Sequence, residues 1–533
     1  MEQVKTPALA ILLLAALSLA LWGCGSGGGE GDGAQPARPA ASEPIIVSIP
    51  ADVQKLDPPQ PTDGNSLLVI SHLYDTLVDF HDTEVSVVPG LAKSWDVSED
   101  GLRYSFHLRD DATFSNGDPV DAAAVRYTFE RIVDTSHPEH FSIAWRSYIL
   151  GDWFDHIETP DDLTVVFVLN RPFVPLLYNL AIPAASIVHP GHVREMGADR
   201  VVSSPLGSGP FVLEEWKPGA YVSIKARESH WRGKPKTDRI IFRVQRDQNQ
   251  TMSALRTGDS HLAVVLTPSV IGDRANLGEA VILDFPILSL CHVYLNVEKP
   301  SMKSPALRRA LNFAVNREAI CETLLEGMGT PAYTALPPGM LGHRPTDEIP
   351  NRFRHDPEEA RHILAEAGLK GVKLTMHCFN EARPYNPVGV RLAQRLQEDF
   401  RQVGIEVELI QMDFGGWIET VDQRTVHEMA LAGWSADTGD PDNFIQLLFL
   451  DETNRSNYKN PAALALMKEA QGESDPARRA SLYQQAEDLM FLDPPAITIS
   501  HARGIKGASK RLRGYKPHPI RSDYLGDAWL ADE

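Results

Sequence analysis

The chain has 533 residues, of which 43% are hydrophobic and 23% are charged, and its formal net charge at pH 7 is -20. This composition excludes a wholly disordered chain, and the length predicts two or three lobes because a single core stops growing at smaller sizes. The negative charge argues against a nucleic-acid partner, since binding to a phosphate backbone depends on clustered Lys and Arg. A soluble, exported protein is favoured instead.

The N-terminus has the pattern of an export signal. Its apolar run from Ala8 to Trp22 is shorter than the roughly 20 residues that a membrane-spanning helix needs. The tetrapeptide that ends at Cys24, Leu-Trp-Gly-Cys, resembles the lipobox of bacterial lipoproteins, which implies a signal peptide over 1–23 and lipidation of Cys24. The Gly-, Pro- and Ala-rich residues 24–43 then predict a flexible tether. The resemblance implies a periplasmic or cell-surface protein anchored by lipid to a bacterial membrane, and a plain cleaved signal is the alternative.

Three further cysteines, Cys291, Cys321 and Cys378, form no CxxC pair and have no histidine at zinc-ligand spacing. At most one disulfide is possible, and the sequence leaves open which two would pair. We expect each to be a small buried hydrophobic side chain.

The hydrophobic pattern after residue 44 mixes two periods. Short β-branched runs at 45–50, 164–170 and 221–226 predict strands, whereas 120–133 predicts a helix. The fold class is therefore predicted to be α/β.

The clearest unit lies between Gly371 and Phe444. Expected strands alternate there with expected helices: strand 372–379, helix 388–404, strand 405–412, helix 414–423 and strand 426–434. This order predicts a βαβαβ unit, in which parallel strands are joined by right-handed crossovers and ligands bind beyond the carboxyl ends of the strands.

The loop 435–443 follows the third of these strands and contains Asp437, Asp440 and Asp442. So many carboxylates need a positive partner, which could be calcium, a Lys or Arg elsewhere in the fold, or a cationic ligand. Gly439 and the proline at 441 predict a tight turn, so we expect Asp440 or Asp442 to cap the following helix. Asp437, nearest the strand end, is the one expected to face the ligand crevice.

The loop 380–387 follows the first of these strands and contains Arg383. Two prolines and an aromatic residue stiffen this loop, which suits a guanidinium group to bidentate recognition of a carboxylate. Local pairing with Glu381 is the alternative.

No enzyme, metal or cofactor motif is complete. Residues 433–437 begin like a nucleophile elbow, but Asp437 stands where glycine is required. Residues 427–431 lack the second histidine of a zinc-protease helix, and the calcium-loop pattern that starts at 96 has His107 at its twelfth position. The sequence predicts no enzyme, no cofactor and no metal site. It also has no P-loop, so any ATPase would be a separate protein.

Three longer blocks carry a family resemblance: 91–132, 207–219 and 304–320. The chain is similar in them to the family 5 extracellular solute-binding proteins of bacterial ABC importers. The resemblance implies a two-lobed periplasmic binding protein of type II with an extra subdomain in the first lobe. It also implies a monomer that delivers its ligand to ABC permease subunits served by a separate ATPase.

The same resemblance implies domain limits. They are domain I over 44–86, 204–290 and 503–533, the extra subdomain over 87–203, and domain II, which holds the ligand clamp, over 291–502.

The expected ligand residues come from blocks 382–387 and 433–444, which resemble those of dipeptide-binding members. In those members an arginine of the first block binds the peptide carboxylate and an aspartate of the second binds the peptide ammonium. The resemblance therefore implies these roles for Arg383 and Asp437, and capture of short peptides, most of all dipeptides.

Four further residues are candidates for the ligand site. Block 59–66 resembles the family's ligand loop of domain I, which implies backbone contacts from Gly64 and Asn65. Trp434 and Trp417 are candidates for lining side-chain pockets, with a core role as the alternative. Haem and glutathione binders share much of this pattern, so a metal chelate, haem or a glutathione-like solute is the alternative ligand.

Overall fold

The computed structural model of the chain describes residues 43–140, 149–271, 277–349, 352–451, 454–520 and 523–532. All of them belong to the unit Ser42–Glu533. The signal peptide expected over 1–23, the lipidation site Cys24 and the tether as far as residue 42 lie outside the described residues. No helix within the described residues is both long enough and apolar enough to cross a membrane.

A 12-stranded sheet runs through most of the fold, in the order β16-β15-β17-β13-β18-β11-β1-β10-β9-β8, with β12 and β14 also paired to β18. The strands of this sheet are β1 Ile45–Ile49, β8 Phe211–Lys217, β9 Tyr221–Ala226, β10 Arg239–Val244, β11 Leu262–Ala263, β12 Ala280–Pro286, β13 Ser289–Leu295, β14 Gly329–Pro331, β15 Val372–Phe379, β16 Ile405–Met412, β17 Met429–Ser435 and β18 Ala496–Ser509.

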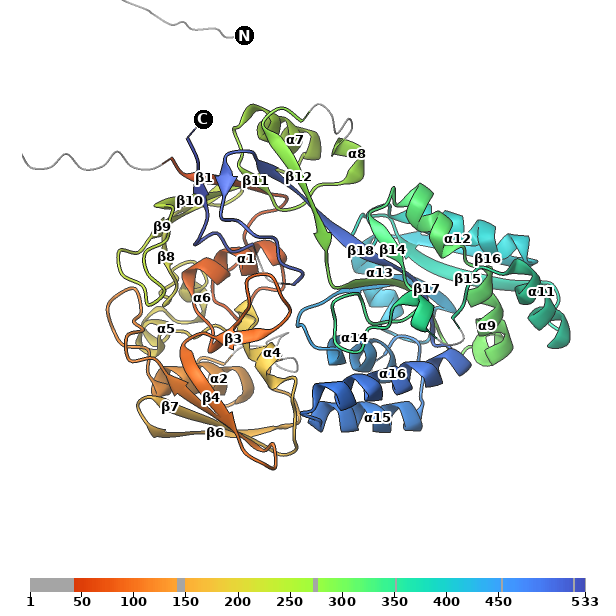
Figure 1. Cartoon of the computed structure of the whole chain (residues 1–533), viewed down its shortest axis with the longest axis horizontal. Helices are drawn as coiled ribbons and strands as arrows, with labels where there is room; N and C mark the ends of the chain where they lie inside the picture. The colour runs from red at the N-terminus through yellow and green to blue at the C-terminus, as the bar shows by residue number, and fades with distance from the viewer. Residues whose placement is uncertain are drawn as a thin grey trace, which may run out of the picture. The chain divides into compact units, whose positions relative to one another are not determined.

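Strand β18 joins two halves of this sheet. Its first residues pair with β13 and β14, and its last residues pair with β11 and β12 (Figure 1). We call the part built on β1 and β8–β12, with the subdomain described next, the first lobe. The part built on β13–β17 is the second lobe.

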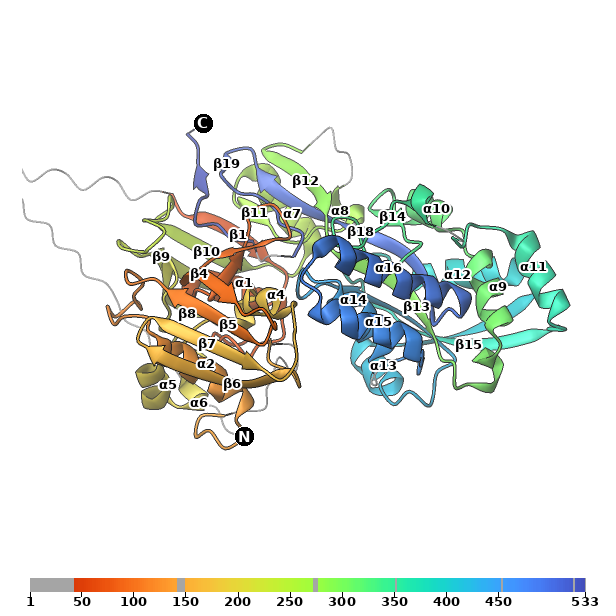
Figure 2. The same ribbon diagram turned by 60° about the horizontal axis from the view of Figure 1, so that its bottom comes forward.

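A separate four-stranded antiparallel sheet, β4-β5-β7-β6, forms the centre of a subdomain of the first lobe (Figure 2). Phe167 at its centre makes edge-to-face contacts with Phe106 and Phe129, with ring centroids 5.5 and 5.1 Å apart, the geometry that aromatic pairs prefer. Its strands are β4 Ala92–Val97, β5 Arg103–Leu108, β6 Phe154–Asp161 and β7 Thr164–Leu169. Two short pairs complete the strands: β2 Val78–Phe80 with β3 Val87–Pro89, and β19 Leu512–Arg513 with β20 Trp529–Leu530.

The helices of the first lobe and its subdomain are α1 Gly64–Leu73, α2 Ala122–Val133, α4 Leu176–Leu180, α5 Pro190–Met196, α6 Ala198–Val201, α7 Gln248–Thr257 and α8 Pro268–Ile271. Those of the second lobe are α9 Pro305–Ala314, α10 Arg317–Ala319, α11 Pro357–Glu366, α12 Val390–Gln402, α13 Phe414–Val421, α14 Asp442–Ile445, α15 Pro461–Gly472 and α16 Pro476–Leu492.

The second lobe contains the predicted βαβαβ unit. Strand β15 pairs in parallel with β16 on one side and with β17 on the other, and α12 and α13 make the crossovers. Helix α12 buries Leu392, Leu396 and Phe400, which recur at the spacing of one helical face. The strands and the helix expected at 45–50, 164–170, 221–226 and 120–133 are likewise confirmed as β1, β7, β9 and α2.

Side chains of alternate residues on β13 enter two different cores. Cys291 and Val293 pack with the apolar side of α12, whereas Leu290 and Tyr294 pack with residues of α13–α16, as the twofold period of a strand requires. The sheet of the second lobe is therefore covered on both faces, and only its strand ends and loops are available to a ligand. All three described cysteines are free and buried, as expected.

Candidate functional site

The loops after β15 and β17 emerge at the same edge of the sheet, because the two strands are parallel neighbours. A cavity of about 700 Å³ lies there, which we call the arginine cavity. Arg383 lines it from the first loop and Ser435 and Ala436 from the second, while Gly64 lines it from the start of α1 in the first lobe. The structure thus brings the predicted Arg383 and Gly64 to one cavity. Asn65 is not among its lining residues.

Arg383 is held by its own loop. Its backbone N–H donates to the Asn386 carbonyl and the Asn386 N–H donates back, both at 2.9 Å, which closes a tight turn. Its guanidinium carbon lies 3.4 Å from the centroid of the Phe414 ring, within the range of a cation–π contact. Trp417 stacks on the Phe414 ring and is only 3% exposed. Trp417 therefore has the core role.

The guanidinium of Arg383 has no anionic partner among the described residues. Its Nε is buried without a hydrogen-bond acceptor. Within the part of the chain that the structure describes, no carboxylate forms an ion pair with Arg383, Glu381 included. Because a buried donor without an acceptor is costly, Arg383 is a candidate for binding an anion from outside the fold.

Asp437 lines a second, smaller cavity of about 50 Å³, which we call the aspartate cavity. Tyr74, Asp75 and Arg232 of the first lobe form its opposite wall. Burial of the carboxyl group raises the pKa of Asp437 to about 7, since a charge away from water is disfavoured. No Lys or Arg forms an ion pair with Asp437 anywhere in the described ranges.

Asn443 positions the loop that contains Asp437. Its side-chain oxygen accepts the backbone N–H of Asp437 at 3.1 Å and the indole N–H of Trp434 at 2.9 Å. Trp434 is half-buried against the second-lobe core and lines neither cavity, so it supports the loop rather than the pocket. Sequence reasoning missed Asn443, whose only signal is its place in the same Asp-rich turn.

The expectation that Asp440 or Asp442 caps the following helix is confirmed for Asp440. Its side chain accepts the backbone N–H of Asp442, the first residue of α14, at 2.9 Å, although Pro441, directly before the helix, provides no side-chain cap. Asp440 also accepts two hydrogen bonds from Arg479, at 2.7 and 2.9 Å. The positive partner of Asp440 is therefore a residue of α16, and both aspartates remain structural, because Asp442 accepts a bond from Gln471 at 2.8 Å.

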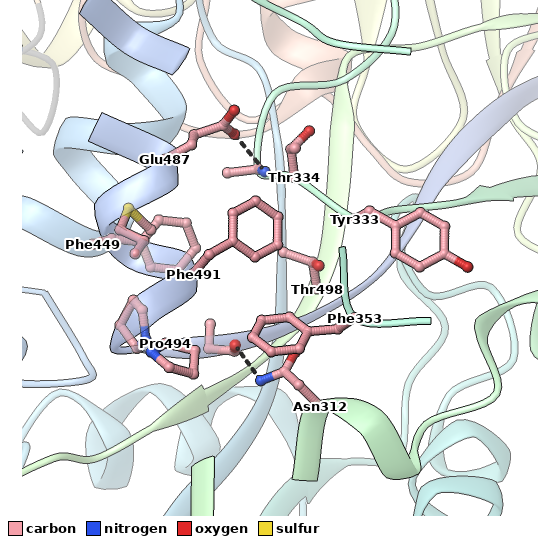
Figure 3. Close-up of a pocket in the computed structure, with 13 residues that line it drawn as sticks. Asn312, Tyr333, Thr334, Phe353, Phe449, Glu487, Phe491, Pro494 and Thr498 are labelled. Atoms are coloured by element: carbon pink, nitrogen blue, oxygen red, sulfur yellow. Dashed lines mark hydrogen bonds between the residues drawn. The ribbon is translucent and has the colours of Figure 1, made fainter. Parts of the chain in front are cut away.

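A further cavity, of about 40 Å³, lies inside the second lobe and contains none of the predicted site residues (Figure 3). Phe449, Phe491 and Phe353 surround it. Burial raises the pKa of Glu487 there to about 7, but its carboxylate accepts the backbone N–H groups of Ala335 and Leu336 at 2.8 and 3.3 Å. This buried acid has donors inside the fold, which Asp437 lacks.

No group of three or more His, Cys, Asp or Glu side chains able to hold a metal ion occurs in the described part of the chain. The candidate site therefore consists of Arg383 and Asp437, which lie on neighbouring loops and form no ion pair with any described residue.

The chain matches the model of the bacterial extracellular solute-binding proteins, family 5 (middle region), over residues 86–456. It belongs to this family. It is 30% identical over 470 residues to the dipeptide-binding protein of Escherichia coli K12, which covers 84% of this chain and 87% of that protein.

Two solved structures agree with this family 5 assignment. HbpA2 from Haemophilus parasuis aligns with a TM-score of 0.83 at 27% identity over 92% of this chain and 100% of that one. The periplasmic binding protein DppA from Helicobacter pylori, in complex with the peptide STSA, aligns with a TM-score of 0.79 at 26% identity over 92% and 99%. The predicted two-lobed α/β fold of periplasmic binding proteins is confirmed.

This family 5 protein also has a site residue that sequence reasoning missed. The hydroxyl of Ser435 is buried without a hydrogen-bond partner among the described residues, and Ser435 lines the same cavity as Arg383. In the sequence it was visible only as part of an incomplete nucleophile-elbow pattern.

Proposed function

We propose that this protein is the substrate-binding component of an ABC importer and captures short peptides, most of all dipeptides. The observation that supports this is the pair of unmatched charged groups at one sheet edge, the guanidinium of Arg383 and the carboxyl group of Asp437. The similarity to the dipeptide-binding protein of E. coli points the same way.

The chemistry of a dipeptide suits this pair. A dipeptide is a zwitterion whose charged ends lie about two residue lengths apart, roughly 7 Å. Each end needs an opposite charge when it is removed from water, because an unpaired buried ion is strongly disfavoured. Arg383 receives the carboxylate, and Asp437 receives the ammonium.

The mechanism is capture and delivery, with no bond broken. Strand β18 connects the lobes. The limit between the proposed domain II (291–502) and the last segment of domain I, which begins at 503, falls within this strand. Bending there would let the lobes close over the peptide and exclude water. The closed monomer docks on a membrane permease with a separate ATPase, and a lipid on Cys24 keeps the exported protein at a bacterial membrane.

Isothermal titration calorimetry with Ala-Ala tests this proposal. Asp437→Asn and Arg383→Ala each remove one charge, and we expect each to weaken binding by about 100-fold or more. Arg401→Ala and Asp100→Asn are the matched controls, because both change exposed surface groups. Unchanged binding in both site variants would refute the proposed clamp.

A further inference from the structure

The two cavities at the site differ more than tenfold in volume. The arginine cavity measures about 700 Å³ and the aspartate cavity about 50 Å³. The larger value lies in the range of small-molecule sites, roughly 300–1,000 Å³. The smaller one has room for only a few atoms, since one water takes up about 30 Å³ in the liquid.

The cavities are consecutive along the same segment. Ser435 and Ala436 line the arginine cavity, the next residue, Asp437, lines the aspartate cavity, and Ile520 borders both. A peptide with its ammonium at Asp437 and its carboxylate at Arg383 therefore has its two ends in different cavities. Its first side chain, one carbon from the ammonium, faces the aspartate cavity, and its last side chain faces the arginine cavity.

The charged first-lobe side chains that line the aspartate cavity already have partners within the fold. Arg232 forms an ion pair with Asp79 at 2.8 Å. Asp75 accepts the indole N–H of Trp231 at 3.2 Å and lies 3.3 Å from His230. A bulky side chain in this small cavity would have to displace these polar contacts, which is costly.

The walls of the arginine cavity are mostly apolar. Phe285, Ile287, Leu288, Met328 and Ile505 all line it. The other cations of this wall are matched, Arg503 by Asp284 at 2.6 Å and Lys506 by Asp523. Arg383 and Ser435 supply the unmatched polar atoms, which leaves the rest of the volume to an apolar group.

From this asymmetry we infer that the site selects short peptides with a small first residue and a bulky, apolar last residue, whose carboxylate binds Arg383 and Ser435. This inference rests on the proposed function, because it takes the ends of the peptide to be oriented by Asp437 and Arg383. Burial of a large apolar side chain at one end only gives a preference of about 10-fold or more between sequence isomers.

Calorimetry with the isomers Ala-Phe and Phe-Ala tests the inference, since the two have the same composition and charge. We expect Ala-Phe to bind at least about 10-fold more tightly. Equal affinities, or tighter binding of Phe-Ala, would overturn the assignment of the cavities while leaving peptide capture intact. Failure of both isomers and of Ala-Ala to bind would instead refute the proposed function.

A variant pair tests the arginine cavity itself. Val265 lines this cavity and is 44% exposed, and Val426, which lines neither cavity, is also 44% exposed. Val265→Trp should fill the space and lower the affinity for Ala-Phe by about 10-fold while sparing Ala-Ala. Val426→Trp should change neither. Equal effects of the two substitutions would overturn the inference, and thermal unfolding of both variants verifies that they are folded.

Discussion

Asp437 and Asp440 lie three residues apart in one loop and differ in what surrounds their charge. Asp440 is 1% exposed and receives two hydrogen bonds from the Arg479 guanidinium. Asp437 is half-buried and has no such partner among the described residues, and burial raises its pKa to about 7. The charge of Asp440 is matched inside the fold, whereas Asp437 has no ion-pair partner among the described residues, as the proposed binding of a peptide ammonium requires.

The partner of Asp440 shows the same difference. Burial acts to lower the pKa of Arg479, but the nearby charge of Asp440 outweighs it and the pKa is raised. Arg383 has no such anion in the described part of the chain. Arg479 and Asp440 thus form a complete ion pair that supports the fold. Arg383 and Asp437, each without an ion-pair partner among the described residues, form the proposed site.

The largest expected effect follows removal of Asp440. Asp440→Ala leaves the Arg479 guanidinium buried and unpaired, which should lower the free energy of unfolding by about 3–5 kcal/mol. Urea denaturation measures this change. Glu398→Ala removes a partner of an exposed ion pair on α12 and should change stability little. Equal effects of the two substitutions would show that the Asp440 pair does not support the fold.

Asp437→Asn should affect ligand affinity and leave stability unharmed, in contrast to Asp440→Ala. It removes a buried carboxyl group that lacks an ionic partner, so the ligand-free protein should keep or gain stability, whereas affinity for Ala-Ala falls about 100-fold. Thermal unfolding and calorimetry on the same preparation separate the two effects. A large loss of stability would mean that Asp437 belongs to the fold in the same way as Asp440.

A smaller loss is expected at Ser435. Its hydroxyl, which has no partner among the described residues, lines the same cavity as Arg383, and a hydrogen bond to a charged group contributes about 1.5–3 kcal/mol. Ser435→Ala should therefore weaken Ala-Ala binding by about 10-fold or more, and Ser435→Thr, which keeps a hydroxyl, should restore most of it. Calorimetry that finds no loss in the alanine variant would exclude this contact.

The last expected effect is a dependence of affinity on pH. The ligand ammonium binds ionised Asp437, whose pKa in the ligand-free protein is about 7. Affinity should therefore fall by about 10-fold for each pH unit below 7 and level off above it. The slope should disappear in Asp437→Asn. A slope that persists there would assign the proton to another group, such as Asp442 or Glu487, whose pKa values burial also raises to about 7.

Rising pH should change stability and affinity in opposite directions: the affinity for the peptide rises, whereas the contribution of Asp437 to stability falls. The folded, ligand-free protein holds a proton on Asp437 between the usual value of 3.8 and about 7, where the unfolded chain has lost it. The contribution of Asp437 to stability is therefore present at low pH and is lost as the pH rises through 7. The difference between the unfolding curves of the parent protein and Asp437→Asn measures it.

The sequence could predict the βαβαβ unit and the places of Arg383 and Asp437, because strong periodicity over 371–444 determines which loops follow parallel strands. It could not predict the partner of Asp440, since Arg479 lies 39 residues further on and only tertiary packing brings the two together. The cap expected from local turn chemistry is present, because Asp440 accepts the backbone N–H of Asp442, but the turn itself gives no sign of the long-range ion pair. The cavity volumes depend on side chains from both lobes and have no local signal.

Mass spectrometry of the ligand that co-purifies with the protein tests the central claim most directly. Two unmatched opposite charges at one sheet edge predict short peptides with a free amino group and a free carboxylate, released on denaturation and absent from a preparation of Asp437→Asn. Recovery of haem or a metal chelate, retained equally by Asp437→Asn, would contradict the claim that a peptide completes the charges of Asp437 and Arg383.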